Sequence, residues 1–226
     1  CGAMRIVTAA VALVGAAVLA APPSIAAPDS CAALGGVVAG SNCQVQASNP
    51  AYTMNVTFPL DYPDEQAIID YLTQTRDGFV NVAQDPDARN RPLEMDVTSE
   101  SLSSAQTRSV VLKLFQDVGS AHPTTWYRSF TYDIARGKPV TFDSLFAPDA
   151  KPLDAIFPIV QRELESETGL AGSISPGDGR DSTHYQNFAV TDDSVIFYFG
   201  RAELLPSYAG ETSVTVPRSA LPPLQL

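Results

Sequence analysis

The feature that most constrains the fold is an alternating apolar segment in the middle of the chain. In an extended chain, Val110, Leu112 and Leu114 point to one side and Val111 and Phe115 to the other, within RSVVLKLFQDVG (108–119). Because both faces are apolar, neither is suited to water, and we expect a strand at the centre of a sheet.

Strand and helix patterns alternate along the rest of the chain. Alternating β-branched and aromatic residues predict strands, and apolar residues at helical spacing predict helices. Helices are expected over 63–83 and 152–169, the second beginning near Phe157 or kinking at Pro158. Strands are expected over 52–58, 93–101, 108–119, 124–133, 140–146 (a short strand running into a turn), 187–190, 195–199 and 212–217.

The resulting order is β-α-β-β-β followed by a second β-α-β-β-β. The side-chain patterns of the two halves do not match, so the order is no sign of a duplication. Helices that interrupt mainly antiparallel strands favour the α+β class over a parallel doubly wound sheet. We predict two small lobes, each a mainly antiparallel sheet packed by a helix, over residues 28–137 and 138–226.

The first 27 residues have the pattern of a secretory signal peptide. Arg5 precedes an apolar run from Ile6 to Ala21, and small residues follow at the expected cleavage site after Ala26 or Ala27. The run is about 16 residues long, short of the ~20 that span a bilayer. We therefore expect a secreted protein with no transmembrane anchor after cleavage.

Two cysteines remain in the expected mature chain, Cys31 and Cys43. Export places them in an oxidising compartment, and an even number of cysteines favours pairing. We predict a disulfide that closes an N-terminal loop. The sequence around Cys31, PDSC, lacks the context of a lipidated cysteine.

The net charge of the chain limits the classes of molecule that it can bind. The chain carries a formal charge of −11, so it repels nucleic-acid backbones, and it has no basic patch. The two well-separated histidines and the cysteine pair have no metal-ligand spacing, and no glycine-rich phosphate loop follows a strand. We expect a monomer without metal or cofactor that binds no nucleic acid.

Several motifs together resemble a known family. They are HPTTWY (122–127), YLTQTRDGF (71–79), FPIVQREL (157–164), PVTFDSLF (139–146), YQNFAVTDDSVIFYF (185–199), ELLPSYAG (203–210) and VTVP (214–217). With the signal and the early cysteine pair, the whole chain resembles the mycobacterial secreted immunogenic-protein (secretory antigen) family. Its last third resembles the domain shared with lysozyme-responsive anti-sigma factors. The resemblance implies an α+β fold and an exported antigen retained at the cell wall. It also implies two conflicting roles: binding of a protein partner at the cell envelope or in the host, and ester hydrolysis.

Hydrolysis by a serine needs a histidine base and a carboxylate that orients it. The candidates are His184, with Ser182, Asp181 and Asp178 close in sequence, and His122. The G-x-S-x-G nucleophile motif is absent, and its nearest approximation, GSISPG (172–177), lies in a loop. The structural interpretation is that the 178–184 segment is a polar surface loop and that His122 is a hairpin residue.

Binding of a protein partner is the competing hypothesis. A loop with apolar side chains beside a phenylalanine-rich hairpin could present anchors to a partner. The binding candidates are Glu203, Leu204, Leu205, Pro206 and Tyr208. In the structural interpretation, Leu204, Leu205 and Tyr208 instead pack back over the sheet. The sequence places binding slightly ahead of its alternative, a serine esterase acting on short- to medium-chain carboxylic esters.

Overall fold

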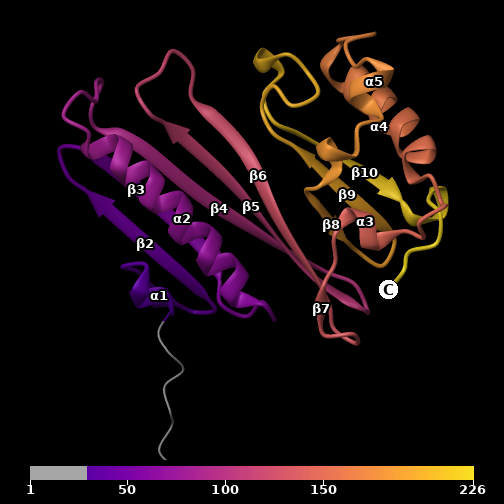
Figure 1. Cartoon of the computed structure of the whole chain (residues 1–226), viewed down its shortest axis with the longest axis horizontal. Coiled ribbons are helices and arrows are strands. Elements are labelled where there is room, and N and C mark those ends of the chain that lie inside the picture. Colours follow the sequence, from indigo (N-terminus) through magenta and orange to yellow (C-terminus); the bar gives the residue numbers. More distant parts are fainter. Residues whose placement is uncertain (1–29) are drawn as a thin grey trace, which may run out of the picture.

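Two β-sheets and the helices packed on them form residues 30–226, the part of the chain that this computed structural model describes (Figure 1). The large sheet has seven strands in sequence order: β1 (Val37–Ala39), β2 (Asn42–Ser48), β3 (Tyr52–Pro59), β4 (Leu93–Ser103), β5 (Thr107–Asp117), β6 (Thr124–Asp133) and β7 (Lys138–Pro139). The small sheet has the order β10 (Thr212–Pro217), β9 (Ser194–Phe199), β8 (Phe188–Val190). The α+β class is confirmed, and the predicted signal peptide lies outside the described residues.

Strand β5 occupies the central position that its sequence predicts. It pairs with β4 on one side and β6 on the other. Val110, Leu112 and Leu114 are buried in the core of the large sheet. Val111, on the opposite face, packs with Ala189 and Tyr198 of the small sheet. The two apolar faces of β5 therefore hold two layers together.

Helix α2 (Glu65–Gln84) covers one face of the large sheet (Figure 1). Its buried residues are Ile68, Ile69, Leu72, Phe79 and Ala83, at the predicted helical spacing. The helix connects β3 to β4, which pair in parallel, whereas all other paired strands in the described chain run antiparallel. The expectation of mainly antiparallel sheets is confirmed, with this one parallel pair added by the helical crossover.

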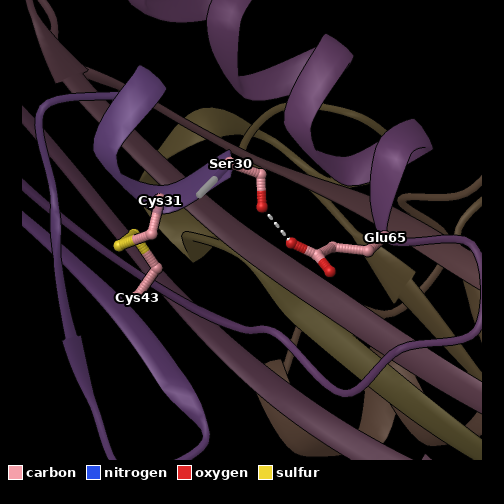
Figure 2. Close-up of a disulfide and its surroundings, with 4 residues drawn as sticks. All are labelled: Ser30, Cys31, Cys43 and Glu65. Carbon is pink, nitrogen blue, oxygen red and sulfur yellow. Dashed lines mark hydrogen bonds between the residues drawn. A yellow bond between two sulfur atoms is a disulfide. The ribbon is translucent and has the colours of Figure 1, made fainter. Parts of the chain in front are cut away.

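The N-terminal segment is fastened by the predicted disulfide. Cys31, in the short helix α1 (Ser30–Ala33), is bonded to Cys43 of β2. Figure 2 shows this bond next to the Ser30 hydroxyl, which donates a hydrogen bond to the Glu65 carboxylate at the start of α2. Strands β1 and β2 were not predicted, although the buried Cys43 and Val45 alternate with polar residues.

The small sheet is covered by α4 (Pro152–Thr168), which contacts β10. Ile156, Phe157, Val160 and Leu164 are buried, as their spacing predicts. The expected start near Phe157 is wrong, because the helix begins at Pro152 and continues through Pro158. Proline is well suited to a first helical position because it needs no donor there. The helix ends at Gly169, whose φ of 69° is left-handed backbone that favours glycine.

Shorter elements complete this part of the chain. They are α3 (Phe142–Leu145), α5 (Pro176–Gly179) and the 3-10 turns η1 (Ser182–Tyr185), η2 (Ser207–Ala209) and η3 (Arg218–Ala220). The expected strand over 140–146 is wrong, because the strand that pairs with β6 is Lys138–Pro139 and residues 142–145 form α3. Thr141 and Ser144 cap each other's backbone N–H groups, and this capping box starts α3 instead.

Side-chain hydrogen bonds join the two sheets. The Phe188 N–H donates to Ser129 Oγ at 2.9 Å, and the Val190 N–H donates to Ser109 Oγ at 3.2 Å. The Ser129 N–H in turn donates to Asn187 Oδ1 at 2.9 Å. Hydroxyls of β5 and β6 thus satisfy backbone groups of β8 that have no strand partner on that side. The division into lobes near residue 137 stays a prediction.

Within residues 30–226, no helix is long and apolar enough to cross a bilayer.

Candidate active site

His184 and Glu203 form the most distinctive pair of polar side chains in the small-sheet layer. His184 lies in η1, before β8, and Glu203 lies in the loop that follows β9. The His184 Nδ1 atom is 3.7 Å from Glu203 Oε1, and the two side chains are 24% and 25% exposed. Glu203 was predicted as a binding residue and His184 as a catalytic base, so the fold brings together members of two competing candidate sets.

The position of Glu203 depends on a tight turn at the end of β9. The Gly200 N–H donates a hydrogen bond to Glu203 Oε2 at 2.7 Å. Gly200 lies against β6, where an added Cβ would be 3.2 Å from both the Thr125 carbonyl oxygen and Trp126 Cα. A side chain at residue 200 would therefore push the turn away from β6 and displace the carboxylate.

The surroundings of Glu203 act on the pKa of its carboxyl in opposite directions. Burial raises the pKa of its carboxyl above the ordinary value, while the Gly200 N–H and His184 act in the opposite direction. A protonated His184 would stabilise the charged carboxylate. The pair can therefore share a proton-dependent interaction, which is the property that an acid–base site requires.

The carboxylates near His184 in sequence have other roles. Asp181 Oδ1 accepts hydrogen bonds from the Thr183 N–H at 2.9 Å and the Thr183 hydroxyl at 2.7 Å. These bonds hold the pKa of the exposed Asp181 below its usual value and cap η1. Asp178 accepts a hydrogen bond from the Ser175 hydroxyl at 2.7 Å. The carboxylate that lies next to the His184 imidazole is that of Glu203.

A cavity of about 460 Å³ lies between α3 and the start of α4. Its wall is largely apolar, with Phe142, Phe146 and Leu153. It also includes the charged Lys151, Asp143 and Asp154 and the half-buried Ser182. The Ser182 side chain makes no hydrogen bond within the described chain, nor does any bond join it to His184. Ser182 therefore reaches the cavity, while His184, two residues later, contacts Glu203.

His122 lies outside this constellation. It is exposed in the turn between β5 and β6, and its carbonyl oxygen accepts a hydrogen bond from the Ser120 hydroxyl at 2.9 Å. Its imidazole makes no hydrogen bond or ion pair with any residue of 30–226. The geometry supports the interpretation of His122 as a hairpin residue.

The 203–210 loop divides into a buried and an exposed half. Leu204 and Leu205 are only 8% and 6% exposed and belong to the small-sheet core, so neither can anchor a partner directly. Pro206 is exposed, and Tyr208 is 75% exposed. Arg201 ties the loop to the β5–β6 turn, because its guanidinium donates to the carbonyl oxygens of Ser207 and Pro123. The sequence did not predict that His184 pairs with Glu203, because residues this far apart in the chain leave no local pattern that links them.

The donor groups for a metal ion are sparse. Among residues 30–226, no group of three or more His, Cys, Asp or Glu side chains is placed to hold an ion.

Comparison with known proteins gives the family. A model described as a protein of unknown function, DUF3298, matches residues 143–219. The chain is 57% identical to Esterase Rv3036c of Mycobacterium tuberculosis H37Rv, over 99% of this chain and 100% of that protein. It is 47% identical to Immunogenic protein MPT64 of the same strain, over 87% of this chain and 88% of that protein.

Among solved structures, a DUF3298 family protein from Pseudomonas aeruginosa PAO1 superimposes with a TM-score of 0.56 at 10% identity. The match covers 79% of this chain and 91% of that one, and it supports the fold alone. The likeness of the last third to anti-sigma-factor domains stays a prediction. The identities to the esterase and the antigen over most of their lengths show that the chain belongs to the MPT64-type family of mycobacterial immunogenic proteins.

Proposed function

We propose that this protein is an exported carboxylic ester hydrolase of the cell envelope. Ser182 is the nucleophile, His184 the general base, and Glu203 the carboxylate that orients the base. The observation that carries the proposal is the His184–Glu203 pair, with Nδ1 and Oε1 3.7 Å apart. The name of the relative at 57% identity, an esterase, supports the same reaction class.

The chemistry follows from the roles of the three side chains. Ser182 Oγ attacks the ester carbonyl carbon while His184 Nε2 accepts the hydroxyl proton, which gives a tetrahedral intermediate. Glu203 holds the tautomer with the proton on Nδ1 and stabilises the imidazolium. His184 then returns the proton to the leaving alcohol, and a water molecule hydrolyses the acyl-enzyme by the same route.

The positions of Ser182 and His184 require one adjustment. Both lie on η1, so rotation of the two side chains must bring Ser182 Oγ and His184 Nε2 into hydrogen-bond contact. Hydrogen bonds of active sites are often long before substrate binds and tighten in the complex. The unengaged Ser182 hydroxyl has no bond to lose in that rotation.

The cavity next to Ser182 supplies a site for the acyl chain. Phe142, Phe146 and Leu153 provide the apolar wall, and a volume of about 460 Å³ suits a short or medium chain. The first turn of α4 borders the cavity, and the positive end of the helix dipole favours the charge that develops on the carbonyl oxygen.

Hydrolysis of p-nitrophenyl butyrate and octanoate by the mature protein, with its disulfide intact, tests the proposal. We expect His184→Ala and Ser182→Ala to lose about 100-fold or more of kcat/KM, the range of acid–base catalysis. His122→Ala is the matched control and should retain activity, because the His122 imidazole makes no hydrogen bond or ion pair within residues 30–226. Equal activity in wild type, Ser182→Ala and His184→Ala, or none in the wild type, would refute the proposal.

A second function, binding of a protein partner, is favoured by one observation. Tyr208, 75% exposed, lies beside the exposed Pro206 on a loop held by Arg201. An exposed aromatic side chain on a fixed loop is typical of binding surfaces. A Tyr208→Ala variant that kept its thermal stability but lost capture of an envelope or host protein would support this function, and unchanged capture would oppose it.

A further inference from the structure

A second cavity, of about 250 Å³, lies between the start of α2, strand β6 and the segment that joins β7 to α3. We call it the Arg128 cavity. Its wall includes Tyr62, Asp64, Arg128, Phe130, Val140 and Phe188. It is separate from the Ser182 cavity, with which it shares no lining residue. The inference drawn from it does not depend on the proposed esterase activity.

Arg128 is held in place by aromatic rings instead of by a carboxylate. Its guanidinium carbon lies 5.2 Å from the ring centroids of both Tyr71 and Phe130. Among residues 30–226, its guanidinium has no hydrogen-bond or ion-pair partner. Arg180 provides the contrast, because it also stacks on a ring, that of Phe157, yet pairs with Asp154. Arg128 is exposed, so the two rings orient its N–H groups, which are open to solvent and free to bind a ligand.

Tyr62 offers a second unused donor to the same cavity. Its side chain is only 6% exposed, and its hydroxyl makes no hydrogen bond within the described chain. Its ring centroid lies 6.3 Å from that of Phe130, the ring on which Arg128 also lies. Burial and the nearby Asp64 raise the pKa of Tyr62, so the hydroxyl remains a donor at neutral pH. Among the described residues, the fully enclosed side-chain oxygen without a partner is Asp133 Oδ2, so the Tyr62 hydroxyl is not sealed from solvent and can donate to a molecule in the cavity.

We propose that the Arg128 cavity binds a small organic carboxylate. One carboxylate group accepts hydrogen bonds from the Arg128 guanidinium and the Tyr62 hydroxyl, and the organic part lies against Phe130, Val140 and Phe188. The planar guanidinium matches a carboxylate in geometry. Phosphate fits less well, because Asp64 places a negative charge at the cavity and phosphate has no organic part to lie against Phe130, Val140 and Phe188.

Titration with sodium benzoate, followed by amide NMR shifts at constant ionic strength, tests this site. We expect saturable shifts in wild type and roughly 10- to 100-fold weaker binding in Arg128→Met, the range expected for a charge-assisted hydrogen bond. Arg128→Lys keeps the charge but loses the planar fork, so it should bind with intermediate affinity. Arg89→Met is the matched control, because Arg89 is exposed and also lacks a polar partner within the described chain.

Two further variants separate the site from general charge effects, and they serve equally if Arg128→Met does not fold. Tyr62→Phe should weaken benzoate binding, whereas Asp64→Asn should strengthen it by removing a repulsive charge. Inorganic phosphate should give no saturable shifts at the same concentrations. Equal benzoate affinity in wild type and the Arg128 and Tyr62 variants, or binding of phosphate in preference to benzoate, would overturn the proposal.

Discussion

His184 and Glu203 lie side by side although two strands separate them in the chain. His184 Nδ1 is 3.7 Å from Glu203 Oε1, with η1 carrying the first residue and the turn after β9 carrying the second. The β8–β9 hairpin lies between them in sequence and returns the chain to the same end of the small sheet. The pair thus depends on the hairpin and on the contact between Gly200 and β6.

Loss of the Glu203 charge should lower the kcat of ester hydrolysis and leave the KM for the ester nearly unchanged. In Glu203→Gln the amide can still accept the Gly200 N–H but cannot stabilise the imidazolium, so we expect kcat to fall about 10- to 1,000-fold with KM little changed. Steady-state kinetics on p-nitrophenyl butyrate measures both constants. Glu211→Gln removes a carboxylate that pairs with Lys113 outside the site, and it should leave kcat unchanged.

The buried carboxyl of Glu203 should make stability fall with rising pH. Because its pKa is raised in the folded protein, the fold holds this proton more tightly than the unfolded chain does. The contribution of Glu203 to the free energy of unfolding is therefore lost as pH rises from the ordinary carboxyl pKa through the raised one. We expect Glu203→Gln to gain stability relative to wild type between pH 4 and pH 7, measured by urea unfolding.

Asp181 should change the pH dependence of stability in the direction opposite to that of Glu203. Hydrogen bonds from Thr183 lower its pKa, so its stabilising effect is present at neutral pH and is lost as pH falls through the lowered value. Relative to wild type, Asp181→Asn should be less stable at pH 7 than at pH 3. If the effects of Glu203→Gln and Asp181→Asn on the free energy of unfolding changed with pH in the same direction, the assigned directions of the two pKa shifts would be contradicted.

The two halves of the 203–210 loop should respond differently to truncation. Leu205 is buried in the small-sheet core, so Leu205→Ala should lower the free energy of unfolding by about 2–5 kcal/mol. Tyr208 is exposed, and Tyr208→Ala should change it by no more than about 0.5 kcal/mol. Urea unfolding of both variants decides whether the burial of Leu205 and the exposure of Tyr208 hold in solution.

Removal of the disulfide should weaken the fold without altering the site. The bond joins Cys31 and Cys43, 12 residues apart, and a loop of this size is worth about 3 kcal/mol on the chain-entropy model. The double variant Cys31→Ala/Cys43→Ala should lose about that much stability while its kcat stays the same. A large fall in kcat of the folded variant would mean that the N-terminal segment reaches the site.

The two sheets should unfold together. The Val190 N–H donates to the buried Ser109 hydroxyl, so Ser109→Ala leaves a buried donor unsatisfied and should cost about 1–3 kcal/mol. We expect one cooperative transition in wild type by both tryptophan fluorescence, from Trp126, and circular dichroism. Two separate transitions would indicate that the lobes divided near residue 137 fold independently.

The sequence by itself determined the elements whose pattern is local. The two faces of β5, the buried stripe of α2, the end of α4 at Gly169 and the Cys31–Cys43 bond all follow from residues close together in the chain. Each depends on side-chain periodicity, backbone preference or short loop closure, which a single sequence displays. The class α+β follows from the order of these elements.

Only the tertiary structure decided which distant side chains meet. It paired His184 with Glu203 instead of Asp181, buried Leu204 and Leu205, and left Arg128 on two aromatic rings without a carboxylate. These outcomes depend on how the small sheet packs against β5 and β6, because that packing sets which surfaces lose water and which charges become neighbours. No local pattern encodes such contacts, so the candidate site became definable only after the two sheets were placed together.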